Sequence, residues 1–316
     1  RLRDFPKRLL KCVKDALPKA GKISLWLLKI ILPVSLFVRF LQYSGALSYF
    51  AEFLNPLFNL IGLPGETAIV FLTSIFLPLY ASIAVMTSLT ITLREATILT
   101  LMCLLSHNLL VESAVQKKTG SSFWWMTTLR ILMSIVVAFV LNMIMPASTV
   151  RFEVVTQPEV FSSVGEVFSA WFNTSVTLII TILLIVSVLM ILQKLLEEYK
   201  LFDTISRPLR PFMKFFGMPE KASFLWIVGN VVGLAYGGAI MIDQIDNGML
   251  SRNDVNVLNH HLAISHSLLE DTLLFVALGI GFWWIVLTRM GFAFVVVWCF
   301  RLKNYVFINK LHSNAV

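Results

Sequence analysis

Charged residues are scarce in this sequence. Only 14% of its 316 residues are Asp, Glu, Lys or Arg, whereas 57% are hydrophobic. A soluble fold of this size needs many more charged side chains on its surface. The composition therefore indicates a protein of the lipid bilayer.

Long polar stretches are also few. Four apolar runs are each about as long as the roughly 17 to 25 residues of a bilayer-spanning helix. They cover residues 23–43, 123–145, 176–192 and 282–300. Because lipid offers no hydrogen-bond partners, spanning segments satisfy their backbone internally as helices. We therefore predict an all-α polytopic membrane protein.

Cysteines and motifs of enzymes are largely missing. Cys12, Cys103 and Cys299 are scattered and show neither a disulfide framework nor the spacing of metal ligands. The chain has no Gly-x4-Gly-Lys-Ser/Thr loop, no Gly-x-Ser-x-Gly elbow and no His-Glu-x-x-His helix. We expect neither an enzyme nor a bound cofactor.

Lysine and arginine are absent from particular stretches. Residues 44–64 contain neither, and residues 147–165 contain only Arg151, whereas basic side chains gather in 1–22, 194–221 and 301–310. The positive-inside rule places these three clusters, and both termini, in the cytoplasm. The net charge of +8 indicates contact with anionic lipid rather than nucleic acid, because aromatic residues do not alternate with the basic ones.

The chain contains an internal repeat. Residues 106–112 (SHNLLVE) match residues 265–271 (SHSLLED), and both are followed by Gly, by Phe-Trp-Trp and by Arg. Matching positions lie 159 apart, since 266 − 107 and 289 − 130 agree. Upstream, Gly-Leu-Pro at 62–64 matches Gly-Met-Pro at 217–219. A paired tryptophan that recurs in register indicates duplication.

Each copy contains an apolar segment that is broken. Residues 66–90 contain Pro78, which removes a helical hydrogen bond, and residues 221–246 contain Gly237-Gly238. We predict that both are helical hairpins that enter and leave by one face; the alternative is a single tilted span. With hairpins each copy crosses the bilayer an odd number of times, so the copies are inverted, as in secondary transporters.

The predicted architecture is two inverted repeats, each with three spanning helices and a broken or re-entrant helical hairpin. Its segments are a basic amphipathic N-terminal arm, the first repeat, an external loop, the second repeat and a basic cytoplasmic tail. They cover residues 1–22, 23–146, 147–165, 166–300 and 301–316.

Ionisable side chains inside apolar helices are costly and are therefore candidates for a functional site. On continuous helices His266 and Glu270 share a face, whereas His107 and Glu112 point about 140° apart. We predict that these residues bind a polar solute or a cation; the alternative is a set of interhelical hydrogen bonds. The candidates are His107, Glu112, His266, Glu270, Asp271, Ser106, Ser265, Asn108, Tyr80 and Tyr236. Weak candidates for a metal site are His107, His266 and Asp271.

Other polar residues are predicted to have supporting roles. We expect Arg130 and Arg289 to pair with Glu112 or Asp271, because a charge in lipid needs a partner. Arg39 is expected to extend toward the membrane surface. His260 and His261 are expected at a solvated helix start.

The Gly-x-Pro segment, the broken hairpin and the Ser-His-x-Leu-Leu-x-acid motif resemble the Gate, or nucleoside recognition, family. That family includes the membrane domains of ferrous-iron permeases and the spore maturation proteins A and B. The resemblance implies a transporter-like fold in a bacterial inner membrane. The expected function is a secondary permease of a small polar solute such as a nucleoside.

The resemblance also leaves alternatives. A membrane scaffold of the spore-maturation type is one, and a divalent-metal permease is the other, although the chain lacks the GTP-binding loop of the iron permeases. A homodimer or a partner membrane protein is compatible with the family.

Overall fold

The computed structural model describes residues 5–76, 79–152, 162–199, 201–231 and 233–313. Within them the chain is helical, with an isolated β-bridge between Thr92 and Arg151. The first half contains α1 (Phe5–Tyr43), α2 (Ala46–Leu60), α3 (Thr67–Phe76), α4 (Leu79–Met86), α5 (Leu93–Ser106), α6 (Leu109–Lys118) and α7 (Phe123–Ile144). The second half contains α8 (Val164–Glu198), α9 (Leu201–Phe215), the 3-10 helix η1 (Glu220–Ala222), α10 (Ser223–Val231), α11 (Leu234–Asp246), α12 (Arg252–Ser265), α13 (Leu268–Ala277) and α14 (Phe282–Ser313).

The helix boundaries repeat as the sequence does. α5 and α6 begin at residues 93 and 109, and their counterparts α12 and α13 begin 159 positions later, at 252 and 268. The ends show the same spacing: α5 and α6 end at 106 and 118, and α12 and α13 end at 265 and 277. The predicted breaks are present, because each broken segment consists of two short helices, α3 with α4 and α10 with α11. That each pair enters and leaves the membrane by one face stays a prediction. The predicted duplication is therefore also a duplication of secondary structure.

Three segments in the described part of the chain are long and apolar enough to cross a bilayer. They are Leu93–Lys118, which comprises α5 and α6, Phe123–Ile144 and Phe282–Val306. The predicted spans at 23–43 and 176–192 lie within α1 and α8. The chain is a membrane protein whose apolar helices contact lipid.

The chain divides into two compact units. Unit 1 comprises Arg1–Leu109, Ser134–Tyr199 and Leu274–Gly281, and unit 2 comprises Leu110–Met133, Lys200–Leu273 and Phe282–Val316. Each unit draws on both copies of the repeat. Unit 1 contains α5 of the first copy and α8 of the second, and unit 2 contains most of α6 of the first copy together with α12 of the second. The predicted segment boundaries stay predictions, and residues 153–161 of the predicted external loop lie outside the described residues.

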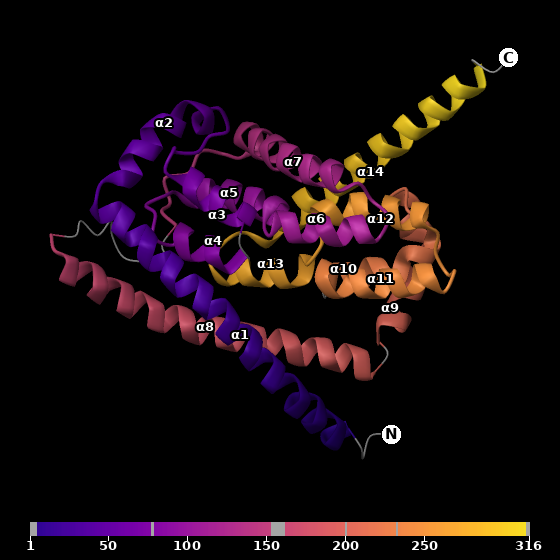
Figure 1. The fold of residues 1–316 in the computed structure, drawn as a ribbon, viewed down its shortest axis with the longest axis horizontal. Coiled ribbons are helices and arrows are strands. Elements are labelled where there is room, and N and C mark those ends of the chain that lie inside the picture. The colour runs from indigo at the N-terminus through magenta and orange to yellow at the C-terminus, as the bar shows by residue number, and fades with distance from the viewer. Residues whose placement is uncertain (1–4, 77–78, 153–161, 200, 232, 314–316) are drawn as a thin grey trace. The chain divides into compact units, whose positions relative to one another are not determined.

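Unit 1 is organised around α1 and α8, which pack against each other (Figure 1). Arg39 on α1 is 5% exposed, and its Nη2 atom donates to Thr174 Oγ1 on α8 at 2.8 Å. The expectation that Arg39 extends outward to the surface is wrong, because its side chain is buried and donates to a hydroxyl of α8 inside the unit. α3 packs against α4 and α5, and α5 is buried from Ala96 to Ser106.

Unit 2 is built on α12, which packs against α14, α10 and α11 (Figure 1). Its apolar core includes Leu225 on α10, Met241 on α11, Leu258 and Leu262 on α12 and Val297 on α14. Small residues allow the helices to approach closely: a Cβ at Gly237 would lie 3.5 Å from the Cα of Gly229, across the hairpin of α10 and α11.

Candidate functional site

The Ser-His motif lies at a break in a helix in both copies. His107 and His266 are the C-caps of α5 and α12, and Asn108 and Ser267 follow with φ of 48° and 53°. A left-handed residue turns the chain out of the helix. The prediction of a continuous helix is therefore wrong, and so are the helical angles inferred for His107, Glu112, His266 and Glu270.

Each break is stabilised by the end of another broken helix. The backbone N–H of Asn108 donates to Ser74 O at 2.9 Å in unit 1, and that of Ser267 donates to Gly229 O at 2.9 Å in unit 2. Ser74 and Gly229 lie in the last turns of α3 and α10, where carbonyls lack helical partners. The two discontinuous elements of each copy thus satisfy one another's backbone groups.

The break in unit 2 yields a prediction at Ser267. Ser267→Val should lower the free energy of unfolding by about 1–2 kcal/mol, because a β-branched residue does not tolerate a left-handed φ. Ser267→Gly should change it by less than about 1 kcal/mol, because glycine adopts this conformation without strain. Thermal unfolding in detergent measures both. Equal melting temperatures for the two variants would contradict the assigned backbone conformation.

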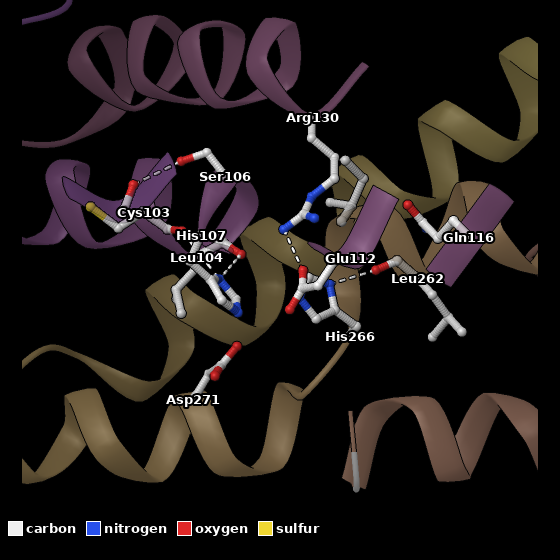
Figure 2. Close-up of polar contacts among 12 residues, drawn as sticks. Cys103, Leu104, Ser106, His107, Glu112, Gln116, Arg130, Leu262, His266 and Asp271 are labelled. Atoms are coloured by element: carbon white, nitrogen blue, oxygen red, sulfur yellow. Dashed lines mark hydrogen bonds and ion pairs between the residues drawn. The ribbon is translucent and has the colours of Figure 1, made fainter. Parts of the chain in front are cut away.

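The two motif histidines use the same ring nitrogen locally. His266 Nδ1 lies 2.7 Å from Leu262 O, and His107 Nδ1 lies 3.1 Å from Leu104 O and 3.3 Å from Cys103 O (Figure 2). A carbonyl oxygen only accepts, so Nδ1 carries the hydrogen in both rings. In a neutral imidazole the Nε2 atom then carries no hydrogen and can only accept.

Unit 2 contains two buried ion pairs, and the acid of each pair follows a Ser-His motif in the sequence. Arg130 Nη2 on α7 lies 2.7 Å from Glu112 Oε2 on α6 (Figure 2), and Arg289 Nη1 on α14 lies 2.8 Å from Asp271 Oδ2 on α13. Both guanidinium groups are fully buried. The predicted pairing is confirmed, and the two pairs occupy equivalent positions of the repeat. Each acid stands in the first turn of its helix, where the helix dipole favours a negative charge.

Arg289 also closes the end of α12. Its Nε atom donates to Ile264 O at 2.9 Å, and its Nη2 atom donates to His266 O. These carbonyls belong to the C-terminal end of α12, which has partial negative charge. Arg289 therefore connects α12, the break and Asp271 on α13.

Glu112 also contacts His266. Glu112 Oε2 lies 3.0 Å from His266 Nε2, at an ion-pair distance. Glu112 belongs to the first copy of the repeat and His266 to the second. The structure thus brings Glu112, His266 and Asp271 into one buried network with the two arginines.

The remaining candidates have different surroundings. Ser106 Oγ on α5 lies 3.1 Å from Ser74 Oγ on α3, so Ser106 joins two helices of unit 1. Ser265 Oγ lies 2.7 Å from His261 Nδ1, one turn earlier on the same helix, α12. Tyr80 is buried on α4 and Glu270 is half-buried on α13. The side chain of Tyr236 lies outside the described part of the structure. Among these candidates, Ser106, His107, Asn108 and Tyr80 belong to unit 1.

His260 and His261 are buried, so the expectation of a solvated helix start is wrong. Ser251 and Asp254 form a capping box that begins α12 well before them. His260 Nε2 accepts from Trp125 Nε1 at 2.9 Å, and His261 Nδ1 lies 3.2 Å from Trp226 Nε1. The Ser-x-x-Asp spacing at 251–254 is the sequence signal that predicts this start.

Asn230 is a buried amide beside the break of α10 that the sequence motifs do not single out. It lies next to Gly229 in the last turn of α10, is 5% exposed, and donates from Nδ2 to Trp226 O at 2.8 Å. Its Oδ1 atom has no hydrogen-bond partner among the described residues. A buried amide in an apolar helix that contains glycines is the signal that marks it.

Comparisons with known proteins agree with these features. The sequence model of the Gate family, described as nucleoside recognition, matches residues 24–122, which contain the first hairpin and the first broken helix. The chain is 31% identical over 276 residues to YvoD of Bacillus subtilis strain 168, named as an uncharacterized membrane protein. This similarity covers 86% of the chain and 88% of YvoD.

The chain belongs to the Gate family. The resemblance inferred from the Gly-x-Pro, hairpin and Ser-His motifs is therefore confirmed. No solved structure matches this Gate protein.

Proposed function

We propose that this Gate protein is a secondary permease for a small polar solute, such as a nucleoside, and not an enzyme. In this proposal the two copies of the repeat are inverted and expose the site alternately to the two sides of a bacterial inner membrane. Both termini lie in the cytoplasm, where the basic clusters place them.

The meeting of two discontinuous helices in each copy carries this proposal. Transporters with inverted repeats bind substrates at such interrupted helices, because their ends expose backbone groups that uniform helices bury. The bonds from Asn108 to Ser74 and from Ser267 to Gly229 form this arrangement twice.

Polar atoms beside these breaks support a polar solute. Asn230 Oδ1 on α10 and Ser82 Oγ on α4 are buried and have no hydrogen-bond partner among the described residues. A buried polar atom without a partner costs about 1–3 kcal/mol. A solute with hydroxyl or amide groups would offset that cost at either position.

The buried arginines argue against a divalent metal as the solute. In unit 2 the buried acids Glu112 and Asp271 each already have a guanidinium partner within 3 Å. A metal ion there would displace or face these cations. A neutral solute avoids that repulsion.

Uptake by purified protein in liposomes tests the proposal. Nucleosides, bases, amino acids and ferrous iron are offered separately, and accumulation is measured with labelled solute. We expect saturable uptake of one uncharged class. Asn230→Leu should lower the apparent affinity for it at least about tenfold, because one to two hydrogen bonds are lost.

Asn247→Leu is the matched control, because Asn247 is an exposed amide in the turn after α11. It should leave uptake unchanged. Uptake of iron alone would replace the solute proposal with a metal permease. No uptake of any class, together with a partner protein bound in fixed ratio, would favour the scaffold.

A further inference from the structure

The contact between His266 and Glu112 requires a proton. His266 Nδ1 lies 2.7 Å from a backbone carbonyl, so the ring hydrogen of a neutral imidazole is already placed there. The opposite nitrogen, Nε2, then presents a lone pair to Glu112 Oε2 at 3.0 Å. A lone pair and a carboxylate oxygen repel at this distance, whereas a proton on either atom makes the contact attractive.

We propose that the His266–Glu112 pair is the proton-binding site of this protein and that the proton is its coupling ion. The role of the proton as coupling ion rests on the proposed transport function. The presence of the bound proton is inferred from the geometry of unit 2 alone. The proton lies on His266 Nε2 or Glu112 Oε2 and is shared by the two.

The surrounding charges make this proton releasable. Arg130 on α7, Arg289 on α14, and Asp271 and Glu270 on α13 are the charged neighbours of the pair in unit 2. Among the buried groups Arg130, Arg289, Glu112, Asp271 and His266, the two arginines balance the two acids, so the added proton gives these five groups a net charge of +1; Glu270 is half-buried and is not counted among them. Both guanidinium groups repel it, and the proton is retained by the short contact with Glu112.

Proton binding also joins the two copies of the repeat. Glu112 stands at the start of α6 in the first copy, and His266 ends α12 in the second. Loss of the proton makes this contact repulsive and separates the start of α6 from α12. The pair is therefore a link between the copies that depends on protonation.

The other end of α6 is held to α12 by uncharged groups. Gln116 Nε2 donates to Asn259 O at 3.0 Å, and Asn259 Nδ2 donates to Thr119 Oγ1 and to Ser121 Oγ, both at 2.9 Å. Amides and hydroxyls keep these bonds at any physiological pH. α6 is thus bonded to α12 at one end regardless of pH, whereas its contact with His266 at the other end depends on a proton. Loss of the proton would let the start of α6 move while its other end stays in place.

His266→Gln tests the coupling, because a glutamine amide can donate to Glu112 without binding a proton. In liposomes the wild type should accumulate solute when a pH gradient is imposed and should also exchange solute without a gradient. We expect His266→Gln to lose at least tenfold of the gradient-driven accumulation and to keep exchange within twofold. Accumulation equal to the wild type would overturn the proposal.

His260→Gln is the matched control, since His260 is a buried histidine of the same helix whose two nitrogens pair with Trp125 and Asn256. It should retain gradient-driven accumulation. Loss of coupling in both variants would overturn the assignment to His266.

A second measurement needs no solute and separates this inference from the proposed function. If the folded protein holds this proton, it binds one proton more than the unfolded chain wherever the unfolded histidine is neutral, so stability should fall as pH rises above the ordinary histidine pKa of about 6.5. Melting curves over that range should show a decline in the wild type and in His260→Gln. His266→Gln should show a smaller decline, because the contribution of one bound proton is absent. Identical slopes in all three proteins would overturn the bound proton, even if solute uptake is observed.

Discussion

Arg289→Met is expected to lower the free energy of unfolding by about 3–5 kcal/mol, because it leaves Asp271 as an unpaired charge inside the protein. Arg289 is fully buried and donates to Asp271 and to two carbonyls at the end of α12. The substitution removes all three bonds. Thermal and denaturant unfolding of the purified protein measure the loss.

A double variant separates the unpaired charge from the lost helix cap. Arg289→Met with Asp271→Leu should recover a large part of the stability, since apolar residues often replace a buried ion pair at little cost. Recovery should be incomplete, because Ile264 O and His266 O remain without the guanidinium. A double variant no more stable than Arg289→Met would contradict the ion pair as the main cause.

An exposed ion pair provides the comparison. Lys214 and Glu220 lie 2.7 Å apart at the surface of unit 2, and the hydrogen bond from Lys214 lowers the pKa of Glu220. Lys214→Met should leave the melting temperature unchanged, because water solvates the carboxylate that remains. A loss as large as that of Arg289→Met would show that charge removal alone, and not burial, decides the effect.

Gly62→Ala should destabilise the protein by about 2–4 kcal/mol, through both backbone strain and overpacking. Gly62, in the Gly-x-Pro segment after α2, has a φ of +74°, and an added Cβ would lie 2.0 Å from Asn142 Oδ1. Asn142 cannot yield freely, because Arg94 Nη2 donates to its Oδ1 at 2.6 Å and to its backbone oxygen at 2.7 Å. The melting temperature of the variant measures the effect.

Gly45 supplies a matched control for the backbone term. Its φ is +73°, nearly that of Gly62, but an added Cβ would meet nothing within 4 Å. Gly45→Ala should therefore cost only about 1–2 kcal/mol. Gly62→Ala combined with Asn142→Ala should approach this smaller value. Equal losses at Gly45 and Gly62 would show that the contact with Asn142 contributes nothing.

The sequence by itself determined the class of protein and its duplication. Apolar runs of spanning length are decided by composition, because only helices satisfy backbone groups in lipid. The repeat is equally plain in the spacing of Ser-His, Phe-Trp-Trp and Arg. That Arg130 and Arg289 pair with Glu112 or Asp271 also followed from sequence, since a charge buried in lipid must find the opposite charge. Which arginine pairs with which acid came from the structure.

Only the tertiary structure decided where the helices break at the motif. Neither Asn108 nor Ser267 requires a left-handed conformation, and an apolar setting favours an unbroken helix. The break is stabilised by the free carbonyls of Ser74 and Gly229, which lie far away in sequence. The residues next to Asn108 and Ser267 in the sequence therefore do not reveal which carbonyl will accept from their backbone N–H groups.

Tertiary structure likewise decided which copy each helix packs with. α6 belongs to the first copy by sequence, yet its Glu112 meets His266 and its Gln116 meets Asn259, both of the second copy. Duplicated segments carry equivalent surfaces, so sequence similarity alone does not distinguish packing within a copy from packing between copies. Close contact of particular side chains, such as Val115 on α6 against Gly238 on α11, selects between them.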